Sequence, residues 1–128
     1  MKAVRLFLAI LVFGAFFGPT APVNAHHSVI AEFDVDKSIT VTGVLTKLDW
    51  ILPHSWIYVD VKAPDGKVER WSFLLPSTFR RQGAAKGYFM LGETLHITGA
   101  PARGVPRRGY VTDLKFPDGR ILSMRGQL

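Results

Sequence analysis

The sequence of 128 residues contains no cysteine. This absence excludes disulfide bonds, thiolate chemistry and cysteine-based zinc sites. The sequence also lacks the nucleophile turn G-x-S-x-G, a phosphate-binding loop, the zinc-protease motif H-E-x-x-H and any carboxylate spacing that specifies a glycosidase. We therefore predict a protein that binds rather than catalyses, and whose stability comes from a packed core alone.

Long apolar runs are confined to the amino terminus. Lys2 and Arg5 precede the apolar stretch 6–18, and residues 19–25 then read PTAPVNA. A basic start, an apolar middle and a segment of small residues are typical of a secretory signal peptide. We therefore expect residues 1–25 to be a signal peptide and the protein to be periplasmic or secreted.

The alternative, a membrane anchor, requires a longer apolar run. The stretch covers 13 residues, whereas a spanning helix needs about 20. Val23 and Ala25 supply the small residues that signal peptidase requires at positions −3 and −1. This pattern predicts cleavage between Ala25 and His26, and no stable membrane span.

The remaining chain, residues 26–128, has the size of one small domain. The whole chain has a formal charge of +6, and without Lys2 and Arg5 the remaining domain has +4. Its basic residues concentrate between Arg103 and Arg108. A basic surplus favours anionic partners, although it can also simply keep a small exported domain soluble. Because export argues against nucleic acid, we expect no nucleic-acid partner, and a metal ion or an anionic envelope component instead.

Most of this domain has the alternation of β-strands. After a polar lead-in at residues 26–36, strands are predicted over 38–50, 55–63, 68–76 and 93–99, with a last hairpin over 110–124. Gly43 inside the first strand predicts a bulge or sharp bend. A short helix over 78–82 is predicted between the third and fourth strands, capped by Ser77 and ended by Gly83.

Five or six strands with one helix after the third indicate an all-β protein. The order is that of a small OB-like barrel, in which closure removes exposed sheet edges. The alternative is a small open β-sandwich.

Several stretches together resemble a known family. They are AHHS at the cleavage point, AEFD, ITVTGVLTKLDW, PHSWIYVDVK, DGKVERW, RRQG, LGETLHITGAPAR and FPDGR, between about His26 and Met124. The sequence is similar to a family of small exported bacterial proteins of unknown function. That family has a mature His-His-Ser start and an Asn-Pro-His motif between its first two strands. Here the motif reads Leu52-Pro53-His54, so His54 is present and the amide is not. The resemblance implies an exported β-rich domain and no established activity.

Three of the four histidines suggest a metal site. After cleavage, His26 would offer both its α-amine and its ring, His27 is adjacent, and His54 follows the first strand. Imidazole and amine nitrogens suit Cu(II), Ni(II) or Zn(II), with copper bound most tightly. Carboxylates at Glu32 and Asp34 could complete the ligand set or orient a ring. The alternative is that these histidines are purely structural, and His96 is predicted to be exposed and unrelated.

An interaction surface is the second hypothesis. The OB-fold surface of the second and third strands commonly binds nucleic-acid strands or sugars. The candidate residues, for an anionic or glycan partner, are Trp56, Tyr58, Arg70, Arg103, Arg107 and Arg108. Aromatic residues on half-buried strands are also common in cores, so this interpretation stays open.

Overall fold

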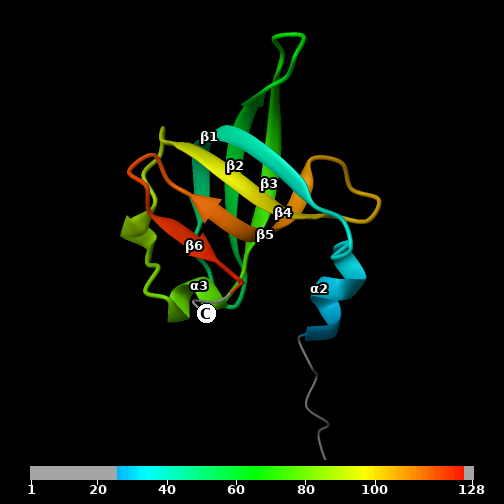
Figure 1. Cartoon of the computed structure of the whole chain (residues 1–128), viewed down its shortest axis with the longest axis vertical. Coiled ribbons are helices and arrows are strands. Elements are labelled where there is room, and N and C mark those ends of the chain that lie inside the picture. The colour runs from blue at the N-terminus through cyan, green and yellow to red at the C-terminus, as the bar shows by residue number, and fades with distance from the viewer. Residues whose placement is uncertain (1–25, 126–128) are drawn as a thin grey trace, which may run out of the picture.

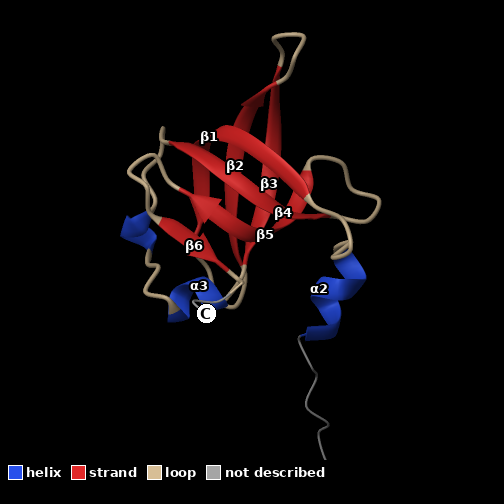
Figure 2. Cartoon of the chain, in the orientation of Figure 1, coloured by secondary structure: helices blue, strands red, loops and turns tan. Residues whose placement is uncertain are grey.

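The fold is a twisted β-barrel with short helices at its edges (Figures 1 and 2). It is taken from a computed structural model that describes residues 26–125, with side chains from Val29 onward. The predicted signal peptide and its cleavage point lie outside the described residues, apart from the backbone of His26. The elements are α2 (His26–Glu32), β1 (Ile39–Asp49), β2 (Ser55–Lys62), β3 (Val68–Leu75), α3 (Thr78–Arg81), the 3₁₀ turn η1 (Lys86–Tyr88), β4 (Thr94–Pro101), β5 (Arg108–Lys115) and β6 (Ile121–Ser123).

The sheet closes on itself between β3 and β5. Its strand order is β3-β2-β1-β4-β5-β6, and residues 72–74 of β3 pair in parallel with residues 108–110 of β5. Strands β1 to β5 therefore form a closed barrel and β6 extends β5 at its edge. This confirms the OB-like fold, with its helix between the third and fourth strands. The open β-sandwich is wrong, because the β3–β5 pairing leaves no gap in the barrel wall.

Side chains alternate between the inside and the outside of the barrel along each strand, and those inside are mostly large and apolar. On β2, Ile57 and Val59 are fully buried while Trp56 and Tyr58 face outward and are partly exposed. The fully buried interior also contains Leu45, Phe73, Phe79, Leu95, Ile97, Val111, Leu114 and Phe116. Within the residues described, no helix has the length and apolar character needed to span a bilayer.

Two glycines mark places where strands approach each other closely. A Cβ at Gly43 would lie 3.0 Å from the Asp60 carbonyl oxygen on β2. The irregularity of β1 falls instead between Leu45 and Lys47, so the bulge predicted at Gly43 is displaced. Gly99 adjoins a register shift between β4 and β5, and a Cβ there would collide with the Tyr110 carbonyl oxygen.

The lead-in at residues 26–36 is not irregular, because it contains α2. Phe33 directly follows α2, and its backbone N–H donates to the Val29 carbonyl oxygen over 2.8 Å. Val29 and Phe33 pack with Leu74 and Tyr110 on the outside of the barrel. The backbone N–H of Arg103 donates to the Glu32 carbonyl over 2.8 Å, and that of Asp34 donates to Pro101 over 2.8 Å. These contacts attach the end of α2 beside the β3–β5 closure.

The predicted helix after β3 is confirmed as α3, but its capping is not as expected. Ser77 has helical backbone angles and its side chain makes no capping hydrogen bond. The serine is therefore already part of the turn rather than an extended residue before it. Gly83 does end the segment, with φ of +95°.

Candidate functional site

The β1–β2 loop carries His54 and is held by a buried serine. Ser55 is 2% exposed. Its hydroxyl donates to the Ile51 carbonyl oxygen over 3.0 Å and accepts from the Arg80 guanidinium over 2.5 Å. The same guanidinium lies 4.0 Å from the ring centroid of Trp50. The loop therefore has a fixed path between two anchored ends, Trp50 and Ser55, with His54 exposed next to one of them.

Substitution of Ser55 by alanine is expected to destabilise the protein by about 1–2 kcal/mol, because it removes both hydrogen bonds of a buried hydroxyl. The Arg80 guanidinium still donates to the Ile51 carbonyl oxygen over 3.2 Å. Urea unfolding measures this change. The matched control is Ser77→Ala, which removes an exposed hydroxyl without a capping bond and should stay within about 0.5 kcal/mol. Equal effects of the two substitutions would show that Ser55 does not anchor the loop.

The structure brings this loop against α2. A pocket of about 160 Å³ is lined by Val29 and Glu32 of α2, by His54, and by Trp56 and Leu74 of the barrel. A neighbouring pocket of about 270 Å³ also has Val29 and His54 in its lining. Helix α2, which begins with His26 and His27, therefore ends beside His54.

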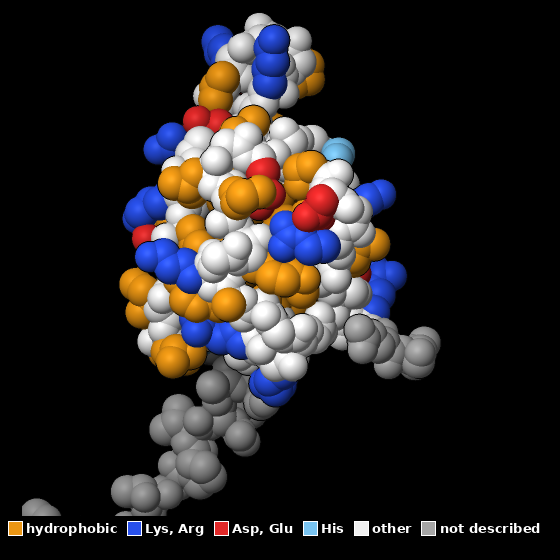
Figure 3. Space-filling model, turned by 90° about the vertical axis from the view of Figure 1, so that its left-hand side faces the viewer, with side chains coloured by type: hydrophobic (Ala, Val, Ile, Leu, Met, Phe, Trp, Pro, Cys, Tyr) orange, Lys and Arg blue, Asp and Glu red, His pale blue; other side chains and the backbone are white. Residues whose placement is uncertain are grey.

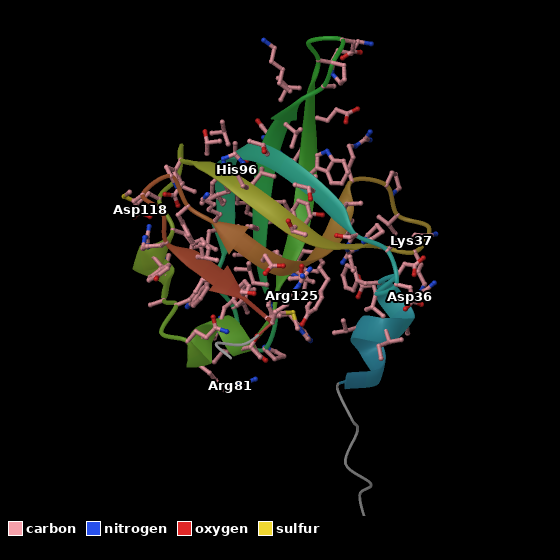
Figure 4. All side chains as sticks on the ribbon, in the orientation of Figure 1. Asp36, Lys37, Arg81, His96, Asp118 and Arg125 are labelled. Carbon is pink, nitrogen blue, oxygen red and sulfur yellow. The ribbon has the colours of Figure 1, made fainter. Side chains whose placement is uncertain are left out.

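The four histidines differ in location and in whether the structure describes their side chains. His26 and His27 open α2, and their side chains lie outside the described part of the chain. Among the residues whose side chains are described, no three His, Asp or Glu groups converge as a metal site. His96 is exposed on β4, as predicted. It contacts Thr42 over 2.9 Å through its Nδ1 and lies away from α2 (Figure 4).

Both carboxylates near α2 are already engaged by basic groups. Glu32 forms an ion pair of 3.0 Å with Arg108. Asp34 lies 3.1 Å from Lys37 and 3.5 Å from Arg103. The hydrogen bond from Lys37 lowers the pKa of the Asp34 carboxyl. Of the two, only Glu32 shares a pocket with His54, so Asp34 is poorly placed as a ligand.

The outward aromatic residues of β2 are flanked by basic side chains. The Arg108 guanidinium lies 4.4 Å from the ring centroid of Trp56, and the Lys47 ammonium lies 4.8 Å from that of Tyr58. Arg70 is bound to Asp60 across β2 and β3 over 2.9 Å. Each ring thus has a cation over it, and both side chains are partly exposed. Trp56 also packs with Val29, Phe33 and Leu74 beside α2.

The basic loop between β4 and β5 does not present free charge. Arg103, Arg107 and Arg108 each face a carboxylate, on Asp34, Glu69 and Glu32 respectively, at 3.5, 3.6 and 3.0 Å. On the face shown in Figure 3, lysine and arginine side chains are scattered among apolar ones. Arg103 and Arg108 therefore tie the α2 segment to the barrel, whereas Arg107 pairs with Glu69 on β3. Their sequence positions alone did not reveal these roles.

Sequence reasoning missed α2 and the Ser55–Arg80 anchor. The spacing of Val29 and Phe33 was the available signal for the helix. Nothing local indicated that Arg80 would reach Ser55, because the pair is separated by 25 residues and meets only in the closed barrel.

Comparison with solved structures supports the fold. A mitochondrial single-stranded DNA binding protein from S. cerevisiae, Rim1, is similar with a TM-score of 0.52 and 8% sequence identity, covering 63% of this chain and 93% of that one. The N-terminal domain of the PriB protein from Thermoanaerobacter tencongensis is similar with a TM-score of 0.45 and 15% identity, covering 63% and 96%. The likeness to Rim1, at 8% identity, concerns the fold alone.

The prediction that excluded nucleic acid as a partner is contradicted by this comparison. A protein that binds single-stranded DNA has the same barrel, so the fold gives no ground for the exclusion.

Sequence comparison places the chain in a family whose function is unknown. No curated protein matches the chain. The family described as "Family of unknown function (DUF6152)" matches residues 16–111.

Proposed function

Because the chain belongs to the Family of unknown function (DUF6152), which carries no activity to transfer, we propose a function from its own residues. The protein is an exported, periplasmic or secreted OB-fold module that binds a transition metal, most favourably Cu(II). Its ligands are the α-amine and ring of His26, the ring of His27 and the ring of His54. Its role is to bind, store or deliver the metal rather than to catalyse a reaction.

The observation that carries this proposal is the contact between α2 and the β1–β2 loop. Val29 and His54 line the same two pockets. His26 precedes Val29 by three residues, which is close to one helical turn of 3.6. The backbone of His26 therefore lies about one turn before a residue that lines the 160 Å³ pocket together with His54, which supports the choice of these histidines.

The donor chemistry favours copper. Neutral imidazole and amine nitrogens are intermediate ligands, and Cu(II) has the highest affinity for them among divalent first-row metals. The absence of cysteine leaves no thiolate to favour Cu(I). Glu32, held by Arg108 at the same pocket, is placed to accept a hydrogen bond from a ligating ring and so to orient it.

The test combines intact mass, metal content and substitution. Protein purified from the cell envelope under native conditions is expected to begin at His26 and to carry about one copper per chain. In Cu(II) titrations, His54→Ala should weaken binding at least about tenfold, since loss of even an outer-sphere partner costs 10–100-fold. The matched control, His96→Ala, removes an exposed histidine away from α2 and should leave the affinity unchanged. A chain that starts at His26 but takes up no copper would refute the proposal.

The alternative function, binding of an anionic or glycan partner through the outward face of β2 and the basic loop, has weaker support. The proposed arginines are paired with carboxylates, and Trp56 is partly covered by Arg108. Tyr58 is partly exposed on that face, with the Lys47 ammonium 4.8 Å from its ring centroid.

A further inference from the structure

A second feature of the molecule lies on the outside of β5. Two pockets of about 310 and 270 Å³ adjoin there and share Tyr110 and Met124 in their linings. The first runs under the segment that leads from α2 into β1, and the second runs from Leu74 toward α3. We call the two together the β5 groove. Each pocket is close to the lower size of known ligand sites, about 300 Å³, and the pair forms an elongated site.

The floor and walls of the groove are largely apolar. Tyr110 is half-buried against Phe33, and Met124 is 38% exposed. Val35, at 49% exposed, lines the opposite wall. The hydroxyl of Thr78, in the lining of the second pocket, is buried and has no hydrogen-bond partner among the described residues. The groove thus offers apolar surface along its length and an unused polar group at one end.

The charged side chains that line the groove are basic. Lys37 and Arg125 line the first pocket and Arg81 lines the second, and none of the described lining residues is aspartate or glutamate. Figure 4 shows that Lys37, Arg81 and Arg125 come from three separate segments around this part of the molecule. Lys37 lies 3.1 Å from Asp34 and Arg125 lies 3.7 Å from Asp113. Lys37 and Arg125 are 73% and 78% exposed, and exposed pairs of this kind are weak, so both cations can turn toward a bound anion.

We infer that the β5 groove binds a single-chain amphiphile with an acidic headgroup, of the fatty-acid class. The carboxylate lies between Lys37 and Arg125, because these are the two cations that share one pocket. The alkyl chain follows Tyr110 and Met124 toward Leu74, where its burial supplies most of the affinity at about 0.8 kcal/mol per CH₂. The headgroup residues and the proposed metal ligands are different, but His54 lines the second pocket of the groove as well, so the two proposals are tested apart by removing metal.

The experiment is a calorimetric titration of the full chain, with EDTA present so that metal plays no part. Dodecanoate, below its micellar concentration, is expected to bind saturably at one site. Butyrate, with the same headgroup and a short chain, should bind at least about tenfold more weakly because it buries eight fewer CH₂ groups. Dodecyltrimethylammonium, with the same chain and the opposite charge, should bind at least about tenfold more weakly because it meets Lys37 and Arg125.

Three variants locate the headgroup. Arg125→Glu should weaken dodecanoate about tenfold by reversing the charge beside it. Lys86→Glu, an exposed substitution outside the groove, and Arg81→Glu, at the groove's other end, should each change the affinity less than about threefold. A larger effect from Arg81→Glu than from Arg125→Glu would overturn the assigned orientation. Equal binding of the anionic and cationic amphiphiles, or no saturable binding of dodecanoate, would overturn the inference itself.

Discussion

Replacement of Gly99 by alanine is expected to lower the free energy of unfolding by about 3 kcal/mol, at the upper end of what overpacking usually costs. The added methyl group would collide with the carbonyl oxygen of Tyr110, with the Val111 Cα only 3.3 Å away. Both obstacles are backbone atoms of β5, which cannot change rotamer to make room. The strands β4 and β5 must therefore separate at the point where β5 also pairs with β3.

Urea or thermal unfolding measures this loss, and Gly87→Ala is the matched control. Gly87 lies in η1 and a Cβ there would meet nothing within 4 Å, so its substitution should change stability by less than about 0.5 kcal/mol. If Gly99→Ala were as stable as Gly87→Ala, the close approach of β4 to β5 would be wrong.

Acetylation of the His26 α-amine in the processed chain is expected to weaken Cu(II) binding by at least about two orders of magnitude. The free α-amine and the ring of one residue chelate as a unit, and two linked ligands bind about 10²–10⁴-fold more tightly than separate ones. The acetyl group converts the amine into an amide and adds no new amine, so one arm of the chelate is lost while every side chain remains. Competition against a chelator of known affinity measures the change.

Two comparisons separate this effect from a change in fold. The acetylated chain should have the same unfolding midpoint in EDTA as the chain with a free amine at His26. Amidation at the far end, on Leu128, should leave copper affinity unchanged. Unchanged affinity after N-terminal acetylation would remove the amine from the ligand set, while leaving the histidine rings to be tested separately.

The β-strands were predictable because each satisfies its own local pattern. The hairpin between β2 and β3 follows from the alternation around Ile57 and Phe73 and from the turn at Asp65-Gly66. The helix after β3 and the strand count then fix the barrel order. The closure of β3 on β5 followed only by analogy with known barrels, because no local signal in residues 72–74 specifies a partner at residues 108–110.

The candidate site was less predictable because its parts meet through tertiary contacts. His54 was identified from the β1–β2 loop, but its position against Val29 depends on α2 docking outside the barrel. The arginines of the β4–β5 loop were taken for a free basic patch. Their charges are neutralised by Glu32, Asp34 and Glu69, residues distant in sequence from the loop. Spacing along the chain carries no information about such pairs.

The parallel pairing of β3 with β5 also bears on the order in which the molecule assembles. Its partners are separated by 36 residues, from Ser72 to Arg108, so closure is a non-local step that follows the local hairpins. Phe33 and the end of α2 attach beside Ala102 and Arg103, which adjoin that closure. A chain that emerges from the ribosome or a translocation pore only as far as residue 107 therefore has neither a closed barrel nor a complete surface on which α2 can dock. The meeting of α2 with His54 thus becomes a late folding event, dependent on the arrival of the carboxyl-terminal strands.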